Sequence, residues 1–432
     1  MTTASERTVH VLKEIVKPVP LGTNLALLQL MWAIISGAFL PARGAVHTAL
    51  NERGFTTQEI RRSWRALHSG QWHIHELTHR FREIVLSEGQ WQPSICGGLR
   101  PVAVDLTAIW RPNLQGWPGK MFRSLAGKKR TGIGFGLIAD VGMILGQRFP
   151  LLRAIVRAET AGESENVLQR RTLHKVAQIL KDDEVSIHDA GVCLTEVQEA
   201  GIARYVVRLR CNATARRNDL PIYGGLGRHP QFGELVRPLP RKRKGKQIAA
   251  TTADRTESFH YAGRLIEAQG WRDLVRSDQH VATATQTYNI WVLDDPAYEN
   301  PLVVATNLDC TAETAYRFYL NRWPVEQIPL VAKQLLGMNR QFVFAHQSCW
   351  RLGELAFLTG NVLAWLAAVL PPIATGFWDR HPKRTPGRLR RRLSRTVFSN
   401  AWLSQPELRK KKSVTSHLPK GIDAHRRRKA PT

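Results

Sequence analysis

Cysteine is scarce in this chain of 432 residues, with five copies at Cys96, Cys193, Cys211, Cys310 and Cys349. Their number is odd, they are widely separated, and no two have the C-x2-C spacing. This pattern does not suggest a disulfide framework or a cysteine-ligated zinc site. We therefore expect a protein of a reducing compartment, the cytoplasm.

Acidic residues are also few, because 35 Asp and Glu stand against 62 Lys and Arg, a formal net charge of +27. This balance predicts a polyanion as partner. Residues 379–432 hold 17 basic and three acidic residues, and we expect this basic tail to be partly disordered. A second basic cluster, Arg241-Lys242-Arg243-Lys244, lies in the proline-punctuated loop 237–246. A hydrophobic content of 43% excludes wholesale disorder.

Long apolar runs are missing. The uncharged stretches 18–42 and 355–378 are interrupted by prolines and polar residues, which leaves apolar cores of roughly 15 residues, below the ~20 that a membrane span needs. The N-terminus, MTTASERTVH, has no apolar segment of the kind found in secretion signals. We therefore expect buried helices at both stretches and no association with a membrane.

The order of periodic patterns predicts an α/β protein. Residues 1–95 are helical and basic, as in a small DNA-binding domain or a generic helical cap. From residue 96 to 211, three strand-like runs at 102–109, 132–141 and 148–159 precede a helix, a strand, a helix and a strand, at 166–180, 184–189, 192–200 and 204–210. This order predicts a mixed sheet covered by helices, as in ribonuclease-H-like domains.

The second half of the chain divides into three further segments. Residues 212–310 form an expected β-rich insertion, with strand-like runs at 258–265, 281–293 and 301–307. Helical patterns at 311–337 and 348–370 then return the chain to the first domain, within the segment 311–375. Residues 376–432 make the basic C-terminal tail.

Two short motifs carry less weight. His75-Glu76-Leu77-Thr78-His79 matches H-E-x-x-H, which on a helix places two zinc ligands beside a general base. No suitable third ligand follows it, so a zinc peptidase is only an alternative. Gly132-Ile133-Gly134-Phe135-Gly136 lacks the spacing of a dinucleotide fingerprint, and we interpret it as the opening of a flexible β-hairpin.

Two aspartates occupy unusual places in the predicted strands. Asp105 lies in the middle of the run Val102–Thr107, where an ionised side chain is costly unless it is paired or binds a cation. Asp189 ends an apolar run and precedes Ala190-Gly191, so it projects from the carboxyl end of a strand, where α/β sheets place ligand sites. Each taken alone also fits a turn or capping aspartate.

A late helical segment carries four polar residues at regular spacing. On an ideal helix Tyr319, Arg322, Glu326 and Lys333 fall within about 60° of one another, on one face. A solvated charged stripe is the alternative interpretation. Pro324 is compatible with a helix that restarts there, with Glu326 in its first turn, whereas Pro329 predicts a kink.

Together these motifs resemble bacterial insertion-sequence transposases of the Asp-Asp-Glu type, specifically the group related to insertion sequence four. That group carries D-x-T, D-x-G and Y-x2-R-x3-E-x6-K, and this chain has Asp105-Leu106-Thr107, Asp189-Ala190-Gly191 and all four residues of the last motif. The resemblance covers residues 95–370, and Val192 departs from the aromatic residue more usual after D-x-G.

The resemblance implies a set of roles. Asp105, Asp189 and Glu326 would be catalytic and would bind Mg2+, with Mn2+ as a substitute, while Tyr319, Arg322 and Lys333 would hold DNA phosphates. The N-terminal helices would bind the terminal inverted repeats, and the 241–244 cluster and the tail would add contacts independent of sequence. A homodimer would pair the two DNA ends. A catalytically inactive DNA-binding relative is the main alternative.

In better-known members of this group the DNA ends pass through a hairpin, a route that needs an aromatic side chain to stack on a flipped base. Trp271, Trp291 and Trp323 are the candidates, although a tryptophan is more often a core residue.

Overall fold

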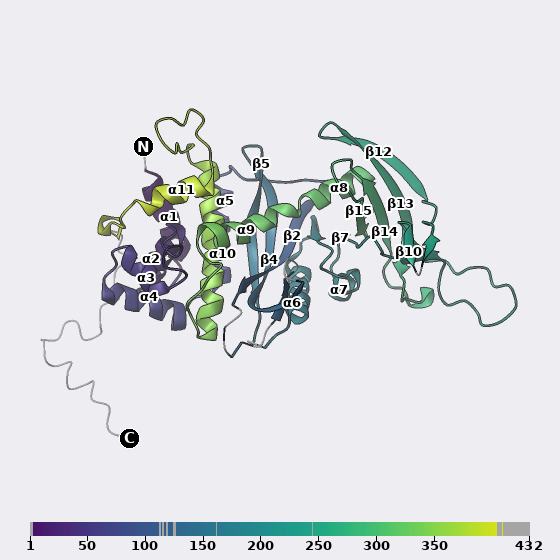
Figure 1. Cartoon of the computed structure of the whole chain (residues 1–432), viewed down its shortest axis with the longest axis horizontal. Helices are drawn as coiled ribbons and strands as arrows, with labels where there is room; N and C mark the ends of the chain where they lie inside the picture. The colour runs from purple at the N-terminus through teal and green to yellow at the C-terminus, as the bar shows by residue number, and fades with distance from the viewer. Residues whose placement is uncertain are drawn as a thin grey trace, which may run out of the picture.

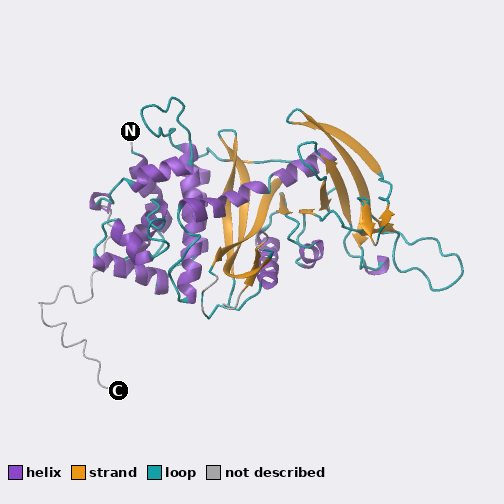
Figure 2. Ribbon diagram, viewed as in Figure 1, coloured by secondary structure: helices purple, strands orange, loops and turns teal. Residues whose placement is uncertain are grey.

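The computed structural model describes residues 3–403, except 112, 113, 115, 118, 119, 124–126, 161 and 244, together with residue 408. Helices form one end of the molecule, the centre of a mixed sheet lies beside them, and a curved group of strands forms the other end (Figure 1; Figure 2). The predicted mixed α/β architecture, with helices first, is confirmed.

Five helices precede the sheet: α1 Ala4–Val16, α2 Thr23–Ile35, α3 Val46–Glu52, α4 Thr57–Ser69 and α5 Ile74–Ser87. Capping boxes begin two of them, Thr3 with Glu6 at α1 and Thr56 with Glu59 at α4, so exposed side chains satisfy backbone groups at each start. α2 is apolar all round and buried along nearly its whole length. The helical pattern expected for residues 1–95 is therefore confirmed.

The centre of the sheet contains the strands predicted between residues 96 and 211. In spatial order they are β5 Gln147–Arg157, β4 Lys128–Ile144, β2 Arg100–Trp110, β6 Glu184–His188 and β7 Tyr205–Arg208. The pairs β2–β4 and β4–β5 are antiparallel, whereas β2–β6 and β6–β7 are parallel. Each parallel step is spanned by a helix, α6 Glu165–Ile179 and α7 Leu194–Glu199. Two short strands, β1 Gln92–Pro93 and β3 Lys120–Arg123, also pair with β4.

The triple-glycine motif lies inside β4, within the predicted strand 132–141, and the interpretation of it as the opening of a hairpin was wrong. A Cβ on Gly134 would lie 2.7 Å from Leu168 Cδ2, and one on Gly136 would collide with Thr172. Both neighbours belong to α6. Glycine at these positions allows α6 to pack directly on the sheet, which is the close backbone approach that a glycine in a strand often marks.

Residues 212–310 are rich in strands, and they extend the central sheet. β15 Leu302–Thr306 pairs with β7, and the sheet continues through β14 Tyr288–Asp294 and β13 Arg264–Arg276 to β12 Arg255–Tyr261 and the short β8 Ala215–Arg217 and β9 Leu235–Val236. The run 258–265 crosses a tight turn, because Ala262 and Gly263 adopt φ of 49° and 77°. The run 281–293 begins with the 3-10 turn η2 Val281–Thr283, and only β14 is a strand. The basic loop 237–246 contains a hairpin, β10 Arg241–Arg243 with β11 Lys246–Ile248.

The chain then returns across the sheet to the helical end through α8 Ala312–Leu320 and α9 Gln327–Leu330 (Figure 1). A 3-10 turn, η3 Trp323–Glu326, and a π-helical turn, η4 Val331–Leu335, flank α9. Among the described residues, α10 His346–Val369 is the one helix long and apolar enough to cross a membrane. Because 83% of its most apolar window is buried inside the protein, it has the character of a core helix.

α10 ends at Val369, in agreement with the helical pattern predicted at 348–370, and Pro371-Pro372 follows it. α11 Pro386–Ser394 follows and packs on α1 and α10, with Leu389 and Leu393 fully buried. The beginning of the basic tail is therefore part of the core, since its leucines cover one face of a helix. The 3-10 turn η5 Asn400–Leu403 comes next, and most of the remaining tail lies outside the described residues.

A buried ion network joins the helical end to the central strands. Asp140 of β4 lies 2.5 Å from both Arg82 of α5 and Arg153 of β5, and Arg153 Nη2 donates to Glu184 of β6 at 2.6 Å. Burial raises the pKa of Glu184, but hydrogen bonds from Arg153 and the Lys181 backbone outweigh it and hold the pKa below its usual value. The network fixes the start of β6, the strand that Asp189 directly follows at its other end.

Candidate active site

Asp105 lies in the interior of β2, opposite Leu137 of β4. Burial raises the pKa of its carboxyl to about 7; the charge of Arg322 acts against this shift, and the charges of Glu326 and Asp189 add to it. Three carboxylates from three separate parts of the sequence therefore share one electrostatic environment. An acid with such neighbours is a typical feature of a functional site.

Asp189 directly follows β6 and is held from two sides. The phenol of Tyr319 donates to Asp189 Oδ1 at 3.1 Å, and Arg208 Nη1 lies 3.6 Å from the same oxygen. Arg208 ends β7, the parallel neighbour of β6, so both side chains emerge at the same edge of the sheet. Arg208 belongs to none of the sequence motifs; the one signal for it in the sequence is its place near the end of the predicted strand 204–210.

Glu326 comes from the 3-10 turn η3. Arg322 Nη2 donates to Glu326 Oε1 at 2.6 Å, and the Arg322 side chain is 5% exposed whereas that of Glu326 is 52% exposed. The Arg322 guanidinium also lies 6.0 Å from the centre of the Tyr319 ring. Arg322 is therefore a buried cation at the centre of the cluster, between Tyr319 and Glu326.

Lys333 completes the cluster from the π-helical turn η4. Its Nζ donates to Thr107 Oγ1 at 2.6 Å, two residues beyond Asp105 on β2. Burial lowers the pKa of Lys333 to about 8, and the nearby charge of Asp105 partly offsets this effect. Thr107 is the last residue of the D-x-T motif, so the first and last motifs of the sequence meet directly.

The segment that carries the last motif is not one continuous ideal helix, and its interruptions lie at Pro324 and beside Pro329, as expected from these two prolines. Pro324 lies in η3, consistent with a restart after α8, and Glu326 follows within that first turn. Pro329 lies in α9, directly before the π-helical turn. Because Pro329 lacks a backbone N–H, the regular hydrogen-bond pattern is interrupted. Tyr319 nevertheless bonds to Asp189, and Arg322, Glu326 and Lys333 interact with the charge of Asp105.

The remaining candidates lie elsewhere. His75, Glu76 and His79 are exposed on α5, and His79 Nε2 lies 3.5 Å from Glu83. Arg241 donates to the backbone of Asn212, and neither it nor Lys242 contacts the carboxylate cluster. The side chain of Arg243 and all of Lys244 lie outside the described residues.

The three tryptophan candidates separate clearly by exposure. Trp271 and Trp291 are fully buried, whereas Trp323 is 44% exposed and belongs to η3 with Glu326. Of the three, Trp323 alone has a ring surface that a base can reach.

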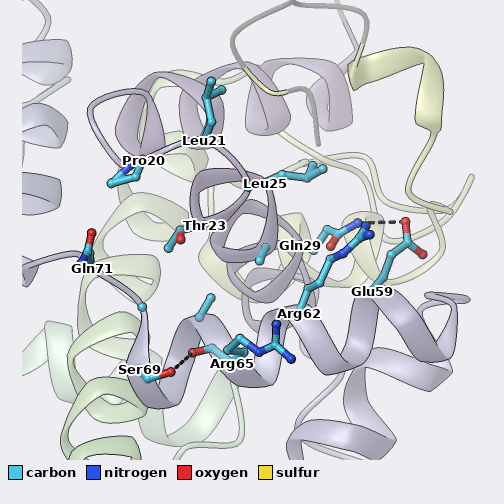
Figure 3. A pocket seen from close by; sticks show the side chains of 14 residues that line it. Pro20, Leu21, Thr23, Leu25, Gln29, Glu59, Arg62, Arg65, Ser69 and Gln71 are labelled. Carbon is cyan, nitrogen blue, oxygen red and sulfur yellow. Dashed lines mark hydrogen bonds between the residues drawn. The ribbon is translucent and has the colours of Figure 1, made fainter. Parts of the chain in front are cut away.

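A surface cavity of about 400 Å3 lies in the helical end of the molecule, between the start of α2 and α4 (Figure 3). Gln29 Nε2 donates to Glu59 at 3.1 Å on its wall, and Ser69 donates to the Arg65 carbonyl. None of the six cluster residues lines it, so this cavity is separate from the carboxylates.

The donor set fits a hard divalent cation in its chemistry, since it offers carboxylate oxygens and the charges of Glu326 and Asp189 add to the raised pKa of Asp105. Within the described residues, however, no three His, Cys, Asp or Glu side chains gather closely enough to hold a metal ion. Arg322 donates a hydrogen bond to one oxygen of Glu326, and Tyr319 donates one to one oxygen of Asp189. Compared with family models and with curated proteins, the sequence of this chain matches none.

Proposed function

We propose that this chain is a DNA transposase of the Asp-Asp-Glu type, which cuts the ends of a bacterial insertion sequence and joins them to target DNA. One observation carries the proposal: Asp105, Asp189, Tyr319, Arg322, Glu326 and Lys333 share one cluster of contacts and charges. A chance match to a sequence motif would not bring together six residues that are spread over residues 105–333.

We also propose that the central strands form a ribonuclease-H-like catalytic domain. Three antiparallel strands, followed by two parallel strands that alternate with helices, support this interpretation. Asp105 is on the first of these strands, and Asp189 follows the fourth.

In this mechanism Asp105, Asp189 and Glu326 would hold Mg2+, or Mn2+ in its place. The metal would supply the chemistry that activates water or a DNA 3′-hydroxyl and stabilises the leaving oxygen. Arg322 keeps the glutamate in place before metal binds and, once that carboxylate is released, its cation is available to a phosphate. Tyr319 and Arg208 orient Asp189.

Lys333 places a second cation beside Asp105, where it holds the DNA backbone without reading its sequence. The N-terminal helices and the basic surface supply the rest of the affinity for double-stranded DNA, and a homodimer pairs the two ends. The protein then acts in the bacterial cytoplasm, on the nucleoid.

A catalytically inactive DNA-binding relative is the second candidate, and the ion pair between Arg322 and Glu326 favours it. A carboxylate that stays bonded to a guanidinium at 2.6 Å cannot give that oxygen to a metal. Such a protein binds the DNA ends as a regulator and leaves them uncut.

Cleavage of DNA that carries the element's own ends, measured with and without Mg2+, separates the two. Wild type should cut, and Glu326→Gln should bind the ends but lose cleavage by at least 1000-fold, since it keeps the shape and removes the charge. Glu313→Gln is the matched control because Glu313 pairs with Arg317 over the same four-residue spacing on α8. If the wild-type protein binds the ends and never cuts them, the result supports the second candidate, a catalytically inactive regulator.

A further inference from the structure

Two exposed phenylalanines lie in the segment that joins η4 to α10. Phe342 is 61% exposed and Phe344 is 66% exposed, and their ring centres are 6.4 Å apart. Gln341, which precedes Phe342, is buried, and so is Val343, which lies between the two phenylalanines. The alternation is that of an extended chain, which turns Arg340, Phe342 and Phe344 to the solvent.

The backbone under these rings is held in place from two directions. The N–H of Phe342 donates to the carbonyl of Gly44 in the helical end of the molecule, and Arg111 Nη1 donates to the carbonyl of Val343 at 3.1 Å. Gly44 has a φ of 85°, and a Cβ there would collide with the Arg340 carbonyl. The two rings are therefore presented by a fixed chain.

Cations accompany both rings. The guanidinium of Arg111 lies 5.5 Å from the ring centre of Phe344, and the exposed Arg340 precedes Phe342 by two residues. The described part of this surface thus combines aromatic faces with positive charge. An apolar protein partner would contact the rings but would not require the positive charge. A nucleic-acid strand uses both features, because its bases stack on the rings and its phosphates bind the cations.

A short length of chain separates this surface from the candidate active site. Arg111 follows the end of β2, four residues or ~13 Å of extended chain beyond Thr107, which accepts from Lys333. The same surface is seven residues beyond Lys333 along the chain, at Arg340. A strand held at the carboxylates can thus reach the two rings.

We propose that Phe342 and Phe344, with Arg111 and Arg340, stack the unpaired bases of a DNA strand that leaves the active site. This inference rests on the proposed function because it takes DNA as the ligand, but it does not require that the protein cleaves DNA. Stacking on an aromatic ring tolerates any base, so the surface is specific for single-stranded character and not for sequence.

The test measures binding of the full chain to a labelled 12-nucleotide oligo-dT strand and to a duplex of equal length, in EDTA and over a salt series. Phe342→Ala/Phe344→Ala should weaken binding of the single strand about tenfold or more and change duplex binding by less than about twofold. Phe377→Ala/Trp378→Ala is the matched control, because this second pair is 99% and 67% exposed and lies near Arg380. It should affect both ligands by less than about twofold.

Wild type should also quench a 2-aminopurine placed in the single strand, a direct sign of stacking that requires no variant. Equal loss for both ligands in the Phe variant, no loss at all, or no quenching by wild type would overturn the inference. So would a change of oligomeric state in the Phe variant in sedimentation, since the rings would then contact a second copy. Stacking of single strands without any cleavage of element ends would support this inference and contradict the proposed function. Cleavage that does not depend on the two rings would support the proposed function and contradict this inference.

Discussion

Arg322 and Glu326 form an ion pair of 2.6 Å in which the guanidinium is buried and half of the carboxylate side chain is exposed. The cation is thus a fixed part of the fold, whereas the carboxylate is free to turn toward solvent. This asymmetry fits the proposed roles, in which Glu326 exchanges Arg322 for a metal ion and Arg322 then binds a phosphate.

Asp105 makes stability depend on pH in the absence of divalent metal. Its pKa of about 7 is above the ordinary value of ~3.9, so its contribution to stability is fully present below pH 4 and is lost as pH rises through 7. Asp105→Asn should therefore stabilise the metal-free protein at pH 8, by up to about 4 kcal/mol, and have little effect at pH 4. Urea unfolding at both pH values measures this difference.

Mg2+ provides the control for that experiment. It should stabilise wild type at pH 8, because it binds the ionised form, and should leave Asp105→Asn unchanged. Equal stabilisation of both proteins would show that Asp105 is not a ligand.

Lys333 should make DNA binding weaken at alkaline pH. Its pKa is lowered to about 8, so above that pH the free protein loses a cation that the DNA phosphates need. Affinity for end DNA should fall, by up to about tenfold per pH unit from this group, while Lys333→Arg keeps its charge and falls less. A titration by fluorescence anisotropy between pH 7 and pH 9.5 tests this, and identical curves for the two proteins would refute a phosphate contact at Lys333.

The buried and the exposed tryptophans should behave differently. Trp291→Ala removes a fully buried ring that stacks under Arg255 at 4.0 Å, and it should reduce the free energy of unfolding by about 3–5 kcal/mol. Trp323→Ala should change stability by less than about 1 kcal/mol and slow the step after first-strand nicking, if this ring stacks a flipped base. Thermal unfolding and a gel assay of hairpin formation give the two readouts.

The sequence predicted the central strands well because their apolar runs are long and bounded by turns. It predicted the partners Asp105 and Asp189 from their places at the middle and the end of such runs. It did not predict β13, in which exposed Leu265, Glu267 and Gln269 alternate with buried residues, so that the strand lacks an apolar run. It predicted a restart at Pro324 and a kink at Pro329, but not that the interrupted segment forms a 3-10 turn and a π-helical turn on either side of α9.

Arg208 and the pair Phe342 and Phe344 show a second limit. Arg208 joins the site only because β7 lies beside β6, a neighbour relation that no local pattern contains. From the sequence alone, two phenylalanines are expected in the core. Their exposure follows from the hydrogen bonds that Gly44 and Arg111 make to the backbone beneath them.

The central claim is that Asp105, Asp189 and Glu326 act as one metal-dependent site, and single-turnover cleavage of end DNA by combined variants tests it most directly. Asp105→Asn, Asp189→Asn and Glu326→Gln should each retain end binding and each lose cleavage by at least 1000-fold. The triple variant should be no slower than the single ones, because residues that act as a unit are not additive. Losses that multiply from variant to variant, or any one variant that cuts at the rate of wild type, would contradict a shared site.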